Sequence, residues 1–143
     1  MAKQLNAMAL ADGLDRLILW GRRYAPVMVS STTVTTLDTL RTDGPLRISA
    51  LAVRESVSQP GMTTLVNRLE AAGHAERYPD PHDGRASLVR ITDAGRKLLA
   101  DRHTTRTRSL LGPIERLDSA DRAALMAALP ALERLINMPM TTE

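Results

Sequence analysis

The 143-residue sequence predicts a mostly helical fold that contains one small β-hairpin, an α+β arrangement supported by three observations. Hydrophobic residues make up 43% of the chain, and many of them recur at the spacing of an amphipathic helix. Aromatic residues make up only 2%, so aliphatic side chains and methionine must fill the core, as is common in helical proteins. One stretch rich in Pro, Asp and Gly, residues 79–86, separates two strand-like runs and predicts the hairpin.

Each element is predicted from local periodicity and from residues that typically start or end it. The predicted helices are residues 5–24, 31 or 32 to 40, 49–54, 58–72, 92–111 and 118–137. The many Thr and Val residues over 27–40 also favour a strand there. The predicted strands are residues 46–48, 75–78 and 87–91. A short turn joins the third and fourth helices, so that together they form a helix-turn-helix.

Prolines, glycines and small polar residues mark the helix ends. Pro26 is expected to stop the first helix, because the residue before a proline disfavours helical geometry. Ser49 is expected to cap the third helix, and Asp118 the last. Residues 112–113, Gly-Pro, are predicted to interrupt the fifth helix, and Pro130 to kink or divide the last.

Composition and charge exclude several kinds of function. The chain has no cysteine, which excludes disulfides, thiolate metal sites and thiol-based redox sensing. No apolar run approaches the roughly 18 residues of a membrane span, and no signal peptide is recognisable, so we expect a cytoplasmic protein. Residues 41–110 contain 12 basic and 8 acidic residues, which favours a polyanionic partner for the middle of the chain.

The predicted helix over residues 58–72 has an apolar side and an uncharged polar side. Its apolar stripe consists of Met62, Leu65, Val66 and Leu69. The exposed start and the opposite side carry Gln59, Pro60, Thr64 and Asn67, with Thr63 and Arg68 on the flanks. This polar side suits a helix that enters the major groove of DNA, because Gln and Asn can read adenine and Thr offers a methyl group or a hydroxyl. A solvated helix face is the alternative.

The predicted hairpin carries an arginine at its tip. Arg85 follows Gly84 and is flanked by Asp80 and Asp83, whose carboxylates are expected to hold its guanidinium in position. An arginine on a thin loop can enter a narrow, electronegative minor groove. A surface turn with solvated charges is the alternative, and it fits less well directly after a helix-turn-helix.

A resemblance to a known family is carried by three motifs in order: S-Q-P-G-M-T-T-L-V-N-R-L-E-A-A-G, E-R-Y-P-D-P-H-D-G-R-A and V-R-I-T-D-A-G. This order resembles the MarR family of bacterial transcriptional regulators, and it is strongest over residues 58–95. The resemblance implies one domain, residues 1–143, with a winged helix-turn-helix lobe at 32–95. It also implies that helices at 5–25 and 112–138 form a dimerisation region.

The family's wing signature reads D-x-R-D-x-R, and this chain departs from it at one position. Asp80, Asp83 and Arg85 match, whereas His82 stands in place of the first arginine. The departure affects one wing contact or an internal ion pair. A histidine at this position can still meet a phosphate and can make binding slightly pH-sensitive.

The resemblance and the residue chemistry together give each candidate a role in DNA binding. Major-groove reading is assigned to Gln59, Pro60, Thr63, Thr64 and Asn67, and phosphate contact to Ser49, Ser58 and Arg68. Arg85 is expected to enter the minor groove, positioned by Asp83. Arg77, at the base of the hairpin, is expected to have a structural ion-pair role.

The resemblance implies a sequence-specific regulator, most commonly a repressor, that binds a pseudo-palindromic promoter site in double-stranded DNA as a homodimer. Two-fold symmetry is expected to place the recognition helices about one DNA turn, roughly 34 Å, apart. Members of the family often bind phenolic anions, and Trp20, Arg23 and Tyr24 are the candidates here for a small phenolic or other aromatic effector. Simple packing of Trp20 and Tyr24 is the alternative.

Other functions are weighed against DNA regulation. A winged helix used only for protein–protein interaction, without specific DNA binding, is the main alternative. His82 with Asp80 and Asp83 makes half a metal site, but His74 and His103 lack ligand spacing to it, so neither a metal nor another cofactor is expected. No catalytic constellation is recognisable, and an enzyme is not expected.

Overall fold

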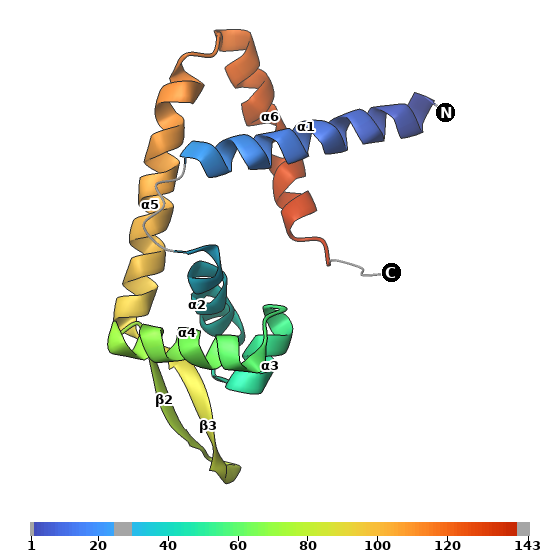
Figure 1. Cartoon of the computed structure of the whole chain (residues 1–143). Helices are drawn as coiled ribbons and strands as arrows, with labels where there is room; N and C mark the ends of the chain where they lie inside the picture. Colours follow the sequence, from blue (N-terminus) through green and yellow to red (C-terminus); the bar gives the residue numbers. More distant parts are fainter. Residues whose placement is uncertain (1, 25–29, 140–143) are drawn as a thin grey trace. The chain divides into compact units, whose positions relative to one another are not determined.

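The computed structural model describes residues 2–24 and 30–139, which form six helices and a three-stranded antiparallel sheet (Figure 1). In chain order the elements are α1 (Ala2–Tyr24), α2 (Ser31–Asp43), β1 (Leu46–Arg47), α3 (Ile48–Arg54), α4 (Gln59–Ala71), β2 (Ala75–Asp80), β3 (Asp83–Ile91), α5 (Asp93–Glu115) and α6 (Ser119–Ile136). The predicted mostly helical fold with a small β-hairpin is confirmed. The chain divides into two compact units, one of Met1–Tyr24 with Thr107–Glu143 and one of Ala25–Arg106.

The Ala25–Arg106 unit is built around an aliphatic core. Its fully buried hydrophobic side chains are Leu37, Leu40, Leu51, Met62, Val66 and Val89. These residues come from α2, α3, α4 and β3, so the three helices share one core with the sheet. The apolar stripe predicted for α4 is confirmed, because Met62, Val66 and Leu69 are buried and Leu65 is partly buried against them.

The sheet has the order β1-β3-β2, and β3 pairs with both neighbours. The hairpin strands continue to the tip, where Asp80 pairs with Asp83 and only Pro81 and His82 form the turn. The predicted strands at 75–78 and 87–91 are therefore too short. Local sequence underestimates β2 because Pro79 disfavours a strand, but β2 lies at the edge of the sheet, where a missing N–H is tolerated.

Small polar side chains cap three helices, and the cap predicted at Asp118 is one of them. The capping hydrogen bonds are Thr33 N–H to Ser30 Oγ (3.3 Å), Gly61 N–H to Ser58 Oγ (3.2 Å) and Asp121 N–H to Asp118 Oδ1 (2.7 Å). Each bond satisfies one of the N–H groups that the first turn of a helix leaves without a partner. The expectation for Ser49 is wrong, because α3 already begins at Ile48 and its N-cap is Arg47, which makes no side-chain capping bond.

The two glycine and proline breaks expected in the C-terminal helices do not divide them. α5 runs to Glu115 through residues 112–113, and α6 runs to Ile136 through Pro130. A proline removes a single helical hydrogen bond, and the bonds of its neighbours keep each helix continuous here. At the N-terminus, α1 begins at Ala2 rather than residue 5, while its expected stop, Pro26, lies outside the described residues.

The start of α5 is fixed against the turn that follows α4. Thr92 Oγ1 donates to the Gly73 carbonyl (2.6 Å) and accepts from the Gly95 N–H (3.1 Å). At Gly95 any Cβ would collide with the His74 carbonyl and the Ile91 side chain. The close approach therefore requires glycine, and it secures the base of the hairpin to α4 and α5.

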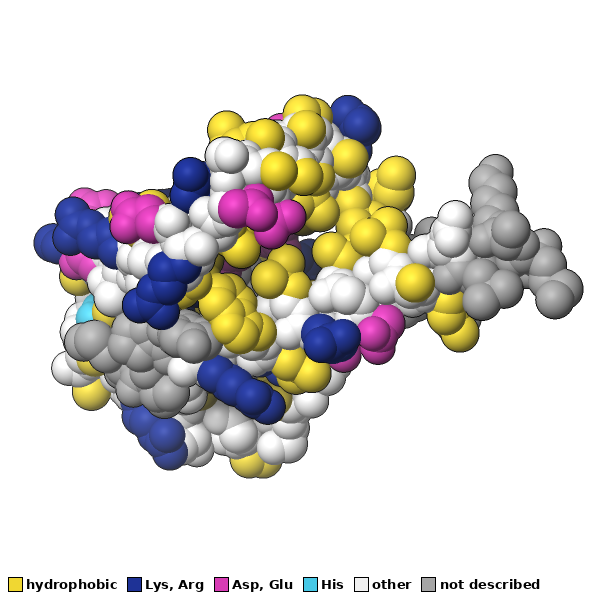
Figure 2. Space-filling view, turned by 90° about the horizontal axis from the view of Figure 1, so that it is seen from above, with side chains coloured by type: hydrophobic (Ala, Val, Ile, Leu, Met, Phe, Trp, Pro, Cys, Tyr) yellow, Lys and Arg dark blue, Asp and Glu magenta, His cyan; other side chains and the backbone are white. Residues whose placement is uncertain are grey.

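The other unit, formed by the two ends of the chain, leaves many large hydrophobic side chains exposed. Those on α1 and α6 are Met8, Leu10, Leu17, Ile18, Leu19, Leu125, Met126, Leu129, Leu135 and Ile136. Yellow hydrophobic side chains stand among the charged ones on the surface seen in Figure 2. None of the helices in the described ranges is both long and apolar enough to cross a bilayer.

Candidate DNA-binding site

The helix-turn-helix is formed by α3 and α4. The turn between them is held by the Glu55 and Val57 N–H groups, which donate to the Leu51 and Ala52 carbonyls (2.9 and 3.0 Å). Ser56 takes a positive φ of 53°, which reverses the chain sharply enough to bring Ser58 to the start of α4. Pro60 lies in the first turn of α4, where its missing N–H costs no helical hydrogen bond.

The outward side of α4 is as the sequence predicts. Gln59, Pro60, Thr64, Asn67 and Arg68 are exposed, and Thr63 is partly buried. The threonine hydroxyls are already engaged, however: Thr63 Oγ1 donates to the Gln59 carbonyl (2.9 Å) and Thr64 Oγ1 to the Pro60 carbonyl (3.0 Å). These two side chains therefore offer methyl groups and hydroxyl lone pairs, but no free hydroxyl donor.

Arg77 on β2 joins the hairpin to α4. Its guanidinium forms an ion pair with Glu70 and donates from Nη2 to Asn67 Oδ1 (2.8 Å). Its backbone N–H also donates to Glu70 Oε1 (3.0 Å). The predicted structural ion pair of Arg77 is confirmed, and it also involves an outward residue of the recognition helix.

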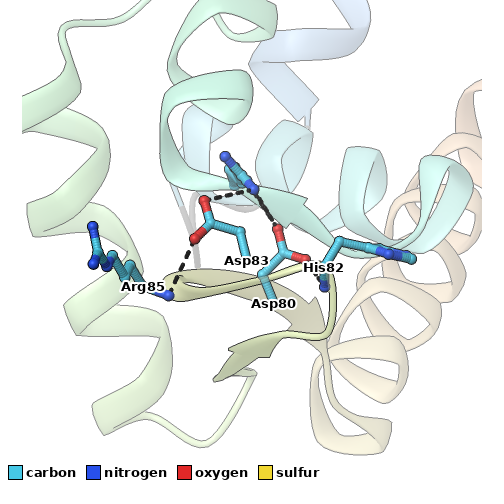
Figure 3. A network of polar contacts seen from close by, with 5 residues as sticks. Asp80, His82, Asp83 and Arg85 are labelled. Carbon is cyan, nitrogen blue, oxygen red and sulfur yellow. Dashed lines mark hydrogen bonds and ion pairs between the residues drawn. The ribbon is translucent and has the colours of Figure 1, made fainter.

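At the hairpin tip two carboxylates hold an arginine that lies far away in the sequence (Figure 3). Asp80 Oδ2 accepts from Arg47 Nε (3.0 Å) and Nη2 (2.6 Å), and Asp83 Oδ2 lies 3.3 Å from the same Nη2. Asp80 Oδ1 accepts the His82 backbone N–H (2.9 Å). The expectation that these carboxylates hold the guanidinium of Arg85 is wrong, since the hydrogen bond between Asp83 and Arg85 comes from the Arg85 backbone N–H (3.2 Å) and not from its guanidinium.

The side chains of Arg85 and His82 thus point away from this network (Figure 3). In the part of the chain that the structure describes, the Arg85 guanidinium has no hydrogen-bond or ion-pair partner. Its backbone is fixed through Asp83 while its charge stays available. Arg68 on α4 is likewise exposed and unpaired within those ranges.

The electrostatics of the tip follow from the contacts of Asp80. The hydrogen bond from the His82 backbone N–H, and then the bonds from Arg47, hold the pKa of the Asp80 carboxyl below its ordinary value. The same pair holds the pKa of Arg47 above its ordinary value. Only 7% of the Asp80 side chain is exposed, and burial by itself opposes the charge, but these bonds outweigh it and the carboxylate stays ionised and paired at neutral pH.

Arg47 is the site residue that sequence reasoning misses. It lies in a two-residue strand, and 33 residues separate it from Asp80. No local pattern relates the two positions, because the contact arises only when β1 pairs with β3.

The remaining predicted residues lie in separate places. Ser49 is exposed in the first turn of α3, and Ser58 is exposed just before α4. Trp20 and Arg23 line a hollow of about 520 Å³ along α1, together with Arg16 and Leu17. The Tyr24 side chain lies outside the described part. Within the described ranges no three His, Asp or Glu side chains gather as a metal site would require.

A helix-turn-helix followed by a β-hairpin that presents an arginine defines a winged-helix DNA-binding protein. The MarR family model matches residues 29–87. An HTH-type transcriptional regulator of Mycobacterium tuberculosis is 31% identical over 124 residues, covering 87% of this chain and 85% of that protein. An HTH-type transcriptional regulator of Mycobacterium leprae is 33% identical over 124 residues, with the same coverage of both chains. The chain belongs to the MarR family and is a DNA-binding transcriptional regulator.

Solved structures agree with this assignment. A transcriptional regulator from Thermotoga maritima is similar with a TM-score of 0.72 and 25% identity, covering 93% of this chain and 94% of that one. S. aureus MepR, solved as a mutant bound to an oligodeoxyribonucleotide, is similar with a TM-score of 0.66 and 20% identity, covering 89% of this chain and 98% of that one. The second likeness concerns the fold alone.

Proposed function

We propose that this chain is a homodimeric repressor that binds a pseudo-palindromic promoter site in double-stranded DNA. The observation that carries the proposal is the Arg85 guanidinium, which the hairpin presents without a partner in the described ranges while Arg47 occupies the neighbouring carboxylates. The DNA-bound MepR structure supports this use of the fold.

The proposed roles divide between α4 and the hairpin, within a DNA-binding lobe at residues 32–95. Gln59, Pro60, Thr63, Thr64 and Asn67 read the major groove, and Arg85 enters the minor groove. Ser49, Ser58, Arg68 and the exposed ring of His82 meet phosphates. Asp83 positions Arg85 through the backbone hydrogen bond at 3.2 Å.

We assign dimerisation to the terminal helices, residues 5–25 and 112–138. The exposed apolar side chains of α1 and α6 support this, because soluble chains bury such surfaces against a partner. Leu17 is 53% exposed and Leu125 50% exposed in the single chain. A second copy of the same helices would cover them.

We also propose that a small phenolic or other aromatic anion releases the DNA. The hollow on α1 combines the indole of Trp20 with the guanidinium groups of Arg16 and Arg23, which suits an aromatic ring bearing a negative charge. PcaV from Streptomyces coelicolor, whose fold is similar, was solved in complex with its natural ligand. Titrating such anions into the protein–DNA complex tests the proposal, and loss of DNA binding is expected.

The experiment that tests DNA binding is a gel shift with the DNA upstream of the protein's own gene, at two salt concentrations. Specific binding should weaken steeply as salt rises, because phosphate contacts release counterions. Arg85→Ala should weaken specific binding by about 1–3 kcal/mol. Arg41→Ala, which removes the same charge from α2, is the matched control and should change it little.

The same experiment separates the alternative function. A protein-interaction module would give no shift, or one that does not depend on salt. An unchanged affinity of Arg85→Ala would remove the hairpin from the mechanism. Footprinting over the shifted fragment then gives the operator, and transcription from it in a strain lacking the gene should rise if the protein is a repressor.

A further inference from the structure

We infer that Asn67 is a fixed hydrogen-bond donor that selects a base whose major-groove edge offers only acceptors, namely guanine or thymine. The inference rests on the proposed function, because it requires α4 to lie in the major groove. It follows from the contacts between Asn67, Glu70 and Arg77, which connect the outward side of α4 to the hairpin.

Glu70 holds Arg77 at two points, its backbone N–H and its guanidinium. Glu70 lies one turn after Asn67 on α4, so the two side chains emerge on the same side of the helix. Glu70 Oε1 accepts the Arg77 backbone N–H (3.0 Å), and Glu70 Oε2 accepts from Nη1. Both side chains are only 28% exposed, which limits their freedom to reorient.

The second step fixes the amide of Asn67. Arg77 Nη2 donates to Asn67 Oδ1 at 2.8 Å. A guanidinium has no acceptor, so the amide atom that faces it has to be the oxygen and not the nitrogen. A flipped amide would place its NH2 group against the cation. The Nδ2 group therefore occupies the other branch of the amide, with no partner in the described part of the chain.

The third step concerns the base that such an amide reads. Bidentate recognition of adenine needs the amide oxygen and nitrogen together, because adenine presents a donor and an acceptor. Here Arg77 already donates to one of the two lone pairs of Asn67 Oδ1, so the adenine amino group would have to share that oxygen with a cation. Guanine and thymine present acceptors only, which match the free N–H groups of Nδ2. This preference differs from the reading of adenine expected for an asparagine from sequence alone.

The test is binding selection from a randomised operator, with the wild-type protein and with Asn67→Ala. The operator position at which Asn67→Ala loses base preference is the one that Asn67 reads. At that position we expect the wild-type protein to favour guanine or thymine over adenine and cytosine by about tenfold. Asn67→Asp has the same shape but no donor, and should lose this preference.

Arg77→Lys tests whether the arginine sets the orientation. Lysine keeps the charge but lacks the fork that holds Glu70 and Asn67 together, so adenine should become as acceptable as guanine or thymine at that position alone. Thermal unfolding checks that the variant is folded. If Arg77→Lys does not fold, Glu70→Gln, which removes the ion pair of Arg77, serves instead. It should weaken the base preference at that position in the same way but to a smaller extent.

The possible outcomes are distinct. Selection of adenine by the wild-type protein at the Asn67 position would overturn the inference, as would a preference that Arg77→Lys and Glu70→Gln leave unchanged. If Gln59→Ala alters base preference and Asn67→Ala does not, the inference fails and the proposed function stands. If no α4 variant alters any preference, the proposed function itself fails.

Discussion

At the scale of single residues, Thr36 is unusual because its hydroxyl is buried in α2 and has no hydrogen-bond partner among the described residues. A buried polar group that forms no hydrogen bond costs about 1–3 kcal/mol of desolvation. Thr36→Val keeps the shape and removes the hydroxyl, so the free energy of unfolding should stay the same or rise by about 1 kcal/mol. Urea unfolding measures this.

The control for that experiment is its buried neighbour Leu37. Leu37→Ala should lower the free energy of unfolding by about 2–5 kcal/mol, because it leaves a cavity in the core. A clear loss of stability in Thr36→Val would show that the hydroxyl has a partner in solution, such as a bound water.

Asp80 gives the hairpin a pH dependence. Because its pKa is lower in the folded protein than the ordinary 3.8, its stabilising contribution is complete above that value and declines as the pH falls below it. Asp80→Asn should lower the free energy of unfolding at pH 7. It should also make that free energy depend less on pH in the acid range, called the acid limb below. Urea unfolding between pH 6 and pH 3 measures the difference, which should shrink toward the acid end.

Arg47→Ala provides the complementary check on that pair. With Arg47 removed, Asp80 keeps only the His82 backbone hydrogen bond, so part of the acid limb should remain. An acid limb identical in Asp80→Asn and wild type would mean that Asp80 is not stabilised by its partners in the folded state.

At the scale of elements, α5 offers the same substitution at two glycines with opposite expected effects. A Cβ at Gly95 would strike the His74 carbonyl, whereas one at Gly112 meets no atom of the described chain within 4 Å. Gly95→Ala should therefore destabilise the fold by more than about 1 kcal/mol. Gly112→Ala should stabilise it by about 0.5–1 kcal/mol, since alanine favours helix.

Thermal unfolding of the two variants side by side gives the measurement. Equal effects would show that the contact between the start of α5 and the turn after α4 is not formed as described. The comparison needs no other control, because both positions lie in one helix and receive the same methyl group.

At the scale of the whole molecule, the exposed apolar side chains of the terminal helices predict the assembly. Sedimentation should give a particle of about twice the 15.6 kDa of one chain. Leu129→Asp, on the exposed side of α6, should shift it toward the monomer and weaken operator binding together. A wild-type protein that sediments as a stable monomer would contradict the proposed dimer.

The exposed Arg96→Asp on α5 provides a comparison for this variant, since it adds a negative charge without removing an apolar side chain. It should leave the sedimentation of the protein unchanged. Loss of the dimer in both variants would point to general charge effects rather than to the apolar surface.

The sequence by itself determined the order of the elements, the buried stripe of α4 and the cap at Asp118. These features depend on local hydrogen bonds and helical periodicity, which neighbouring residues specify. It failed where local preference was weak evidence, as at Pro79, Ser49 and Pro113, because strand pairing and adjacent helical bonds outweigh one unfavourable residue.

Only the tertiary structure decided how the candidate site is arranged. Arg47 reaches Asp80 through strand pairing, which leaves Arg85 free, and Arg77 reaches Asn67 across the junction of β2 and α4. Both contacts join residues ten or more positions apart in the sequence. Other acidic residues lie near each arginine in the sequence, so the sequence alone does not specify the partner. Folding selects the partner because it fixes the distances, and it thereby decides which polar groups remain available to DNA.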